Sequence, residues 1–99
     1  MRTAAVWAVL RRELERHAGR ELTVLDVGGG TGGFAVPLAQ AGHLVTVVDA
    51  SPDALAALTR RAADAGVADR VTAVQGDGDA LAGLIEPGTA DLILCHAVL

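Results

Sequence analysis

The sequence contains a single cysteine, no long apolar run, and no grouping of cysteines or histidines. Cys95 has no second cysteine with which to form an intramolecular disulfide, which suits a reducing compartment. No apolar stretch approaches the roughly 20 residues that a membrane-spanning helix needs, and the N-terminus lacks the pattern of a secretory signal. Without a C-x-x-C pair or clustered histidines, we expect no metal site. These absences favour a cytoplasmic protein that has no membrane span.

Basic residues are scarce after the first twenty positions, and the net charge is −4. Residues 1–20 contain five arginines and two acids, whereas residues 21–99 contain three arginines and ten acids. The longer stretch therefore offers phosphate groups little electrostatic attraction. A nucleic-acid substrate would need a basic surface supplied by another segment.

The length of 99 residues fits one small domain or part of a larger one. Hydrophobic residues make up 52% and charged residues 20%, which excludes a disordered or fibrous chain and is typical of a soluble α/β protein. An open sheet that stopped on a fourth strand would leave an edge unpaired. We therefore expect residues 1–99 to be one partial domain, inactive by itself.

Apolar spacing predicts helices and buried strands in alternation. Strands are expected over residues 22–27, 44–48, 71–74 and 91–95, because these short runs are apolar and rich in β-branched residues. Helices are expected over residues 4–17 (an N-terminal helix within residues 1–19), 31–41, 52–66 and 81–84, with Ser51 as an N-cap. The histidines at positions 17 and 43 are expected on surfaces without a role. This order predicts a doubly wound, parallel α/β sheet.

Ligands of such sheets bind beyond the carboxyl ends of the strands, and a glycine-rich loop follows the first strand. Glycine lets the chain turn sharply and lets a ligand approach the backbone closely. Gly28, Gly30 and Gly33 satisfy the G-x-G-x-x-G dinucleotide fingerprint, with Asp49 about 20 residues further on. A dinucleotide site, another nucleotide-like cofactor and a purely structural turn are all compatible with the loop.

Charge helps to distinguish the candidate cofactors. A nicotinamide dinucleotide places a pyrophosphate against this loop, whereas S-adenosylmethionine carries a sulfonium and an ammonium group and no phosphate. Asp26 at the strand end would repel the first and suit the second. No lysine or arginine occurs from Glu21 to Thr59, which also favours a phosphate-free ligand and disfavours an NAD-binding oxidoreductase.

The loop resembles the class I methyltransferase motif D-x-G-x-G-x-G, matched by Asp26, Gly28, Gly30 and Gly32. The resemblance extends over about residues 20–99 and implies a Rossmann-like fold, of which this chain would be the N-terminal half. It implies that S-adenosyl-L-methionine is the cofactor. Asp49, followed by Ala50, would accept both ribose hydroxyls, although an acid beside Ser51 could also simply cap the next helix.

The same resemblance assigns functions to the loops after the third and fourth strands. Asp77, Gly78 and Asp79 would hold the adenine, and the alternative for these aspartates is a solvated turn. His96 would face the methionine end of the cofactor or the acceptor, and the alternative is a structural or exposed histidine.

More specifically, the chain resembles the bacterial tRNA wobble 5-carboxymethoxyuridine methyltransferases. This resemblance is carried by residues 24–30, 41–43, 49–51 and 91–99, and by Arg2 with Trp7. It implies that the cofactor is held by the residues Arg2, Gly28, Gly29, Asp49, Gly78, Asp79 and His96.

The activity implied is direct methyl transfer, driven by positioning and desolvation rather than by a nucleophilic side chain. The acceptor would be the carboxylate of a modified tRNA wobble uridine, and a small-molecule acceptor is the alternative.

Overall fold

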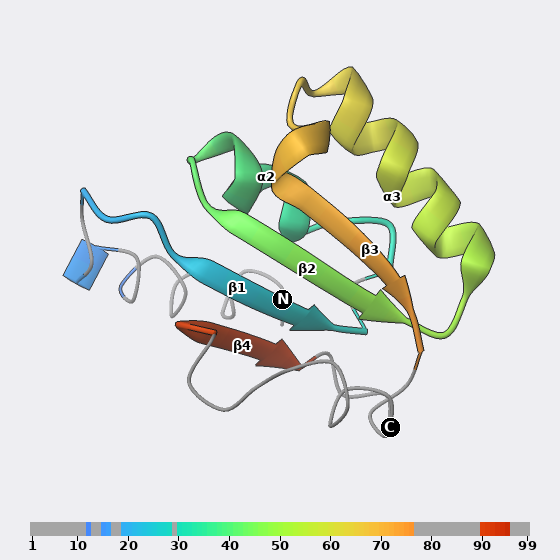
Figure 1. Cartoon of the computed structure of the whole chain (residues 1–99), viewed down its shortest axis with the longest axis horizontal. Helices are drawn as coiled ribbons and strands as arrows, with labels where there is room; N and C mark the ends of the chain where they lie inside the picture. Colours follow the sequence, from blue (N-terminus) through green and yellow to red (C-terminus); the bar gives the residue numbers. More distant parts are fainter. Residues whose placement is uncertain (1–11, 13–14, 17–18, 29, 77–89, 96–99) are drawn as a thin grey trace.

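The computed structural model describes residues 12, 15–16, 19–28, 30–76 and 90–95. In chain order these residues form β1 (Thr23–Val27), α2 (Ala35–Gln40), β2 (Leu44–Asp49), α3 (Pro52–Asp64), the 3-10 helix η1 (Ala68–Arg70), β3 (Val71–Gln75) and β4 (Leu92–Cys95) (Figure 1). Residues 12, 15 and 16 of the predicted first helix are helical. The predicted helix at 81–84 lies outside the described residues.

The four described strands form one sheet in the order β3-β2-β1-β4, and every pair is parallel. The chain leaves β1 on one side for β2 and β3, and then returns to pair β4 with the other side of β1 (Figure 1). The strand order therefore reverses between β1 and β4, which is where open α/β sheets bind ligands. The predicted α/β fold class is confirmed.

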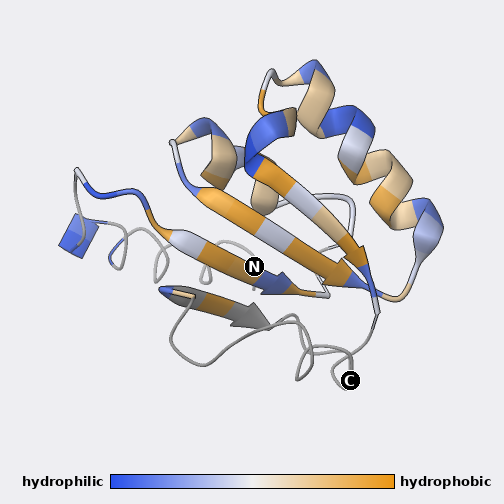
Figure 2. Ribbon diagram, viewed as in Figure 1, coloured by the Kyte–Doolittle hydropathy of each residue, from blue (hydrophilic) through white to orange (hydrophobic). Residues whose placement is uncertain are grey.

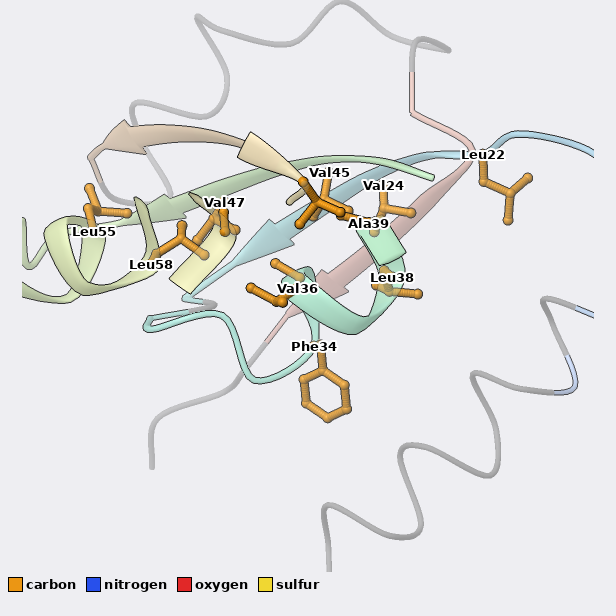
Figure 3. Close-up of a cluster of buried hydrophobic side chains, with 13 residues drawn as sticks. Leu22, Val24, Phe34, Val36, Leu38, Ala39, Val45, Val47, Leu55 and Leu58 are labelled. Carbon is orange, nitrogen blue, oxygen red and sulfur yellow. The ribbon is translucent and has the colours of Figure 1, made fainter. Parts of the chain in front are cut away.

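Helices α2 and α3 both pack on the same face of the sheet. Val24, Val45 and Val47 on the strands join the apolar residues of both helices in one core, and Figure 3 shows their side chains gathered between sheet and helices. The members of this cluster are Leu22, Val24, Phe34, Ala35, Val36, Leu38, Ala39, Val45, Val47, Leu55, Leu58, Ala62 and Val67. This packing holds both helices against one face of the sheet.

Strands β1 and β2 are apolar along most of their length, whereas α3 alternates apolar and polar residues (Figure 2). On the strand face turned away from α2 and α3, Leu25 and Val48 are buried, while Ile93 on β4 is 55% exposed. Burial of the central strands on both faces explains their continuous β-branched sequence. Within the described part of the chain, no helix is long and apolar enough to span a bilayer.

Helix α2 begins later than the sequence suggests. Residues 31–34 form turns, and the helix starts at Ala35 rather than at Thr31. Gly30 and Gly32 have φ of +59° and +94°, values that a right-handed helix cannot include. Pro37 consequently lies in the first turn, where its missing N–H has no intrahelical partner to lose.

Helix α3 follows the sequence prediction closely. Ser51 is the N-cap, and its hydroxyl oxygen accepts a hydrogen bond of 3.2 Å from the backbone N–H of Ala54. Pro52 occupies the first helical position, as expected for a residue without an N–H. The chain between β2 and α3 is therefore only two residues long, which holds the start of α3 next to Asp49.

His43 is half-buried and has a structural role that the sequence does not suggest. Its Nδ1 accepts a hydrogen bond of 3.1 Å from the backbone N–H of Leu22, at the start of β1. His43 lies in the loop before β2, as expected, and its hydrogen bond adds a structural role that no sequence motif indicates. This bond joins the entry of β1 to the turn that precedes β2.

We expect His43→Ala to lower the free energy of unfolding by about 0.5–1.5 kcal/mol, because the N–H of Leu22 loses its acceptor. His43→Asn places an amide oxygen near the position of Nδ1 and should recover most of that loss. Equilibrium unfolding in urea measures both variants. Equal destabilisation by alanine and asparagine would contradict a role for the hydrogen bond.

Candidate ligand-binding site

The loops after β1 and β2 lie side by side at the carboxyl end of the sheet. Parallel pairing places Val27 opposite Val48, so the chain leaves both strands at the same level. The backbone N–H of Gly28 donates to the carbonyl of Val48 at 2.7 Å, which extends the pairing into the loop. Gly30 of the glycine loop and Asp49, which are 19 positions apart in the sequence, are thereby brought into contact.

The Asp49 carboxylate bridges the two loops. Its Oδ2 accepts from the backbone N–H of Gly30 at 3.0 Å, and its Oδ1 accepts from the backbone N–H of Ser51 at 2.9 Å. A carboxylate oxygen accepts two hydrogen bonds, so each oxygen keeps one acceptor position. Asp49 is half-buried and oriented by two backbone groups, as a bidentate acceptor for a vicinal diol should be. Ala50 is the exposed residue that follows it.

The glycines of the loop have different surroundings. A Cβ on Gly30 would lie 3.9 Å from Asp49 Oδ2, with no closer atom among the described residues beyond its chain neighbours, so this position is open toward the carboxylate. A Cβ on Gly32 would lie 2.5 Å from Leu58 Cδ1 and 3.2 Å from Val36 Cγ2. Gly32 therefore seats the loop on the core, and Gly30 leaves space for a ligand.

The surroundings of Gly33 distinguish between the two glycine motifs that the sequence matches. In the dinucleotide fingerprint the third glycine allows close packing of helix and strand. A Cβ on Gly33 would meet no atom of the described residues within 4 Å, and the φ of Gly33 lies outside the left-handed region. The glycine in close contact is Gly32, which belongs to D-x-G-x-G-x-G and not to G-x-G-x-x-G.

Asp26 is fully buried at the end of β1, with 0% of its surface exposed. It lies opposite Val47 of β2 and Leu94 of β4, one residue before the last paired position. An electrostatic effect of Asp26 on a ligand at the strand ends stays a prediction, as does direct contact between Asp26 and a cofactor.

Arg61 on α3 also contacts the glycine loop, a contact that no sequence motif indicates. Its guanidinium Nη1 donates to the carbonyl and the hydroxyl of Thr31, at 3.1 and 3.2 Å. The two partners are 30 positions apart in the sequence, and no motif links them. The loop consequently has a basic neighbour, so the scarcity of basic residues between Glu21 and Thr59 is weaker support for a phosphate-free ligand than expected.

Six predicted site residues lie outside the described part of the chain. These are Arg2, Gly29, Asp77, Gly78, Asp79 and His96. Of the predicted set, the structure describes Asp26, Gly28, Gly30, Gly32, Asp49 and Ala50, all at the ends of β1 and β2. Among the residues that the structure describes, no three His, Cys, Asp or Glu side chains are grouped to hold a metal ion.

Comparison with known proteins identifies the class to which this fold and glycine loop belong. The family described as "Methyltransferase domain" matches residues 24–99. The chain therefore belongs to the methyltransferase domain family, and the resemblance read from Asp26, Gly28, Gly30 and Gly32 is confirmed.

Individual relatives are similar over different shares of their length. The tRNA 5-carboxymethoxyuridine methyltransferase of Escherichia coli K12 is 35% identical over 99 residues, which cover 100% of this chain and 38% of the relative. Aclacinomycin 10-hydroxylase RdmB of Streptomyces purpurascens is 49% identical over 78 residues, 77% of this chain and 20% of the relative. The chain thus spans well under half of either relative.

A solved structure supports the same fold. A SAM-dependent methyltransferase from Geobacter sulfurreducens, crystallised with S-adenosyl-L-homocysteine, superposes with a TM-score of 0.68 at 32% identity. The match covers 81% of this chain and 31% of that one.

Proposed function

We propose that this chain forms the cofactor-binding part of an S-adenosylmethionine-dependent methyltransferase. The observation that carries the proposal is the Asp49 carboxylate, which is held by the N–H groups of Gly30 and Ser51 and retains acceptor positions on both oxygens. The open position at Gly30 supports it, because a ribose can approach the backbone there. The family and the relative crystallised with S-adenosylhomocysteine support the same cofactor.

The chain's own residues bind and orient the cofactor. Asp49 would accept both ribose hydroxyls, and the bridge to Gly30 sets the direction in which its carboxylate points. Asp26 would favour a cation near the end of β1. Arg2, Gly29, Asp77, Gly78, Asp79 and His96 would complete the site and stay predictions. We place residues 1–99 in one cofactor-binding domain, with residues 1–19 as its N-terminal helix.

When bound, the cofactor supplies an activated methyl group on a sulfonium sulfur. The protein contributes orientation of the donor and exclusion of water, which can account for a large part of the barrier reduction. No described side chain needs to be a nucleophile. A carboxylate acceptor is already anionic and needs little general-base help.

We propose the carboxylate of a modified tRNA wobble uridine as the acceptor, on the basis of the E. coli relative that matches the whole chain. A small-molecule acceptor is the second candidate, and the observation that favours it is the 49% identity to a relative named for aclacinomycin. An NAD-binding oxidoreductase is disfavoured by the open Gly33 position. The cytoplasmic location stays a prediction.

Calorimetric titration of the protein with S-adenosylhomocysteine and with NAD tests the cofactor. We expect saturable binding of the first and none of the second. Incubation with methyl-labelled S-adenosylmethionine and tRNA that carries 5-carboxymethoxyuridine should then label the tRNA. Binding of NAD alone would contradict the cofactor assignment. Cofactor binding with transfer only to small molecules would contradict the tRNA assignment and leave the cofactor assignment intact.

A further inference from the structure

The glycine loop receives a side-chain contact from α3. Arg61 Nη1 lies 3.1 Å from the carbonyl oxygen of Thr31 and 3.2 Å from its hydroxyl oxygen. A single guanidinium nitrogen thus donates to both the main chain and the side chain of one loop residue. Both residues are exposed, so the contact lies at the surface of the loop.

Thr31 is located where the loop has the least local restraint. It stands between Gly30 and Gly32, whose φ values of +59° and +94° are ones that glycine adopts without strain. Glycine also has more conformational freedom to lose than other residues, so a segment with flanking glycines needs external contacts to keep one shape. Arg61 supplies such a contact to the residue between them.

Helix α3 couples this contact to the rest of the site. Leu58 and Arg61 are three residues apart and therefore project from the same side of the helix. Leu58 is fully buried against Gly32, while Arg61 reaches Thr31 beside it. The same helix begins two residues after Asp49, whose Oδ2 holds Gly30. Asp49 at the end of β2, together with Leu58 and Arg61 on α3, thus restrains three consecutive loop residues.

We infer that Arg61 is a positioning residue that holds the glycine loop in the shape that binds the cofactor. The inference rests on the proposed function. A ligand that binds one loop shape has an apparent dissociation constant equal to the intrinsic value divided by the fraction of protein in that shape. Loss of the Arg61 contact lowers that fraction, so it weakens cofactor binding without touching the reacting atoms.

The residue type fits this role. Arginine is always charged and presents several donors on a planar group, which lets one nitrogen serve two oxygens that lie close together. It also lies in the last turn of α3, where the helix dipole favours a cation. Because the contact is exposed, we expect a small effect on global stability and a larger one on the loop.

Four variants test the inference in the intact protein. Arg61→Gln removes the positive charge and shortens the side chain, whereas Arg61→Lys keeps the charge and has three N–H donors. Thr31→Val removes the hydroxyl and keeps the carbonyl. Arg60→Gln is the matched control, since Arg60 is the neighbouring exposed arginine of the same helix. For each variant, S-adenosylhomocysteine affinity, the KM for S-adenosylmethionine, kcat and the unfolding midpoint are measured.

We expect Arg61→Gln to raise the dissociation constant and KM about three- to tenfold, the size of one hydrogen bond, with kcat and the unfolding midpoint nearly unchanged. Arg61→Lys should recover part of the loss, Thr31→Val should cause a smaller one, and Arg60→Gln should cause none. Unchanged affinity in Arg61→Gln, or an equal loss in Arg60→Gln, would overturn this inference alone. A wild-type protein that binds no S-adenosylhomocysteine would overturn the proposed function and this inference together.

Discussion

Asp49→Ala is expected to weaken the binding of S-adenosylhomocysteine about 10- to 150-fold, the equivalent of roughly 1.5–3 kcal/mol for hydrogen bonds to a charged group. The carboxylate has two functions that are lost together. It would accept the ribose hydroxyls, and it joins the loops after β1 and β2 through Gly30 and Ser51. Isothermal titration calorimetry measures the affinity directly.

Asp49→Asn separates charge from shape. Each carboxylate oxygen accepts from a backbone N–H. Whichever way the asparagine amide is turned, its N–H₂ donor group faces the N–H of Gly30 or the N–H of Ser51, and that hydrogen bond is lost. We therefore expect asparagine to fail to restore wild-type affinity, although it is nearly isosteric.

Asp64→Ala is the matched control for these variants, because it removes one exposed carboxylate from the far end of α3. Its affinity should equal that of the wild type. If the Asp49→Ala protein folds and binds S-adenosylhomocysteine with wild-type affinity, Asp49 does not contact the cofactor and only connects the two loops.

Gly32→Ala is expected to lower the free energy of unfolding by about 2–5 kcal/mol, from the left-handed backbone and from overpacking together. The φ of +94° is one that L-residues rarely adopt. The new Cβ would also lie 2.5 Å from Leu58 Cδ1, and Leu58 is fully buried with little room to move. Stabilities of ordinary domains are about 5–15 kcal/mol, so the loss is a large fraction of the total.

Gly33→Ala provides the adjacent control, because its Cβ would enter open space. We expect no loss of stability, or a gain of about 0.4–1 kcal/mol from the reduced freedom of the unfolded chain. Urea denaturation monitored by circular dichroism compares the two variants. Equal stability of the two alanine proteins would contradict the account of Gly32 as the glycine that seats the loop on the core.

The two glycine results also bear on the cofactor. A dinucleotide fingerprint requires its third glycine at position 33, whereas the methyltransferase motif requires one at position 32. The structure places the close contact at Gly32. Sensitivity at position 32 together with tolerance at position 33 would therefore agree with the family to which the chain belongs.

The sequence by itself determined the order of the four strands and of α2 and α3, and it located the carboxyl ends of the strands. Continuous β-branched runs are sufficient to predict buried strands, and the Ser51-Pro52 pair predicts the start of α3, since both signals depend on neighbouring residues only. The predicted start of α2 at Thr31 was too early, because the backbone conformation of Gly30 and Gly32 prevents a helix there.

Only the tertiary structure decided which residues act together in the site. The bridge from Asp49 to Gly30 spans 19 residues and the contact from Arg61 to Thr31 spans 30, so neither leaves a periodic signal in the sequence. Both depend on parallel register at the strand ends and on the packing of α3 against the sheet. The same packing gives the two glycines different surroundings: the space at Gly30 is open toward Asp49, whereas Gly32 lies against Leu58. Residues of the same type can acquire different roles only through their surroundings, which the sequence alone does not specify.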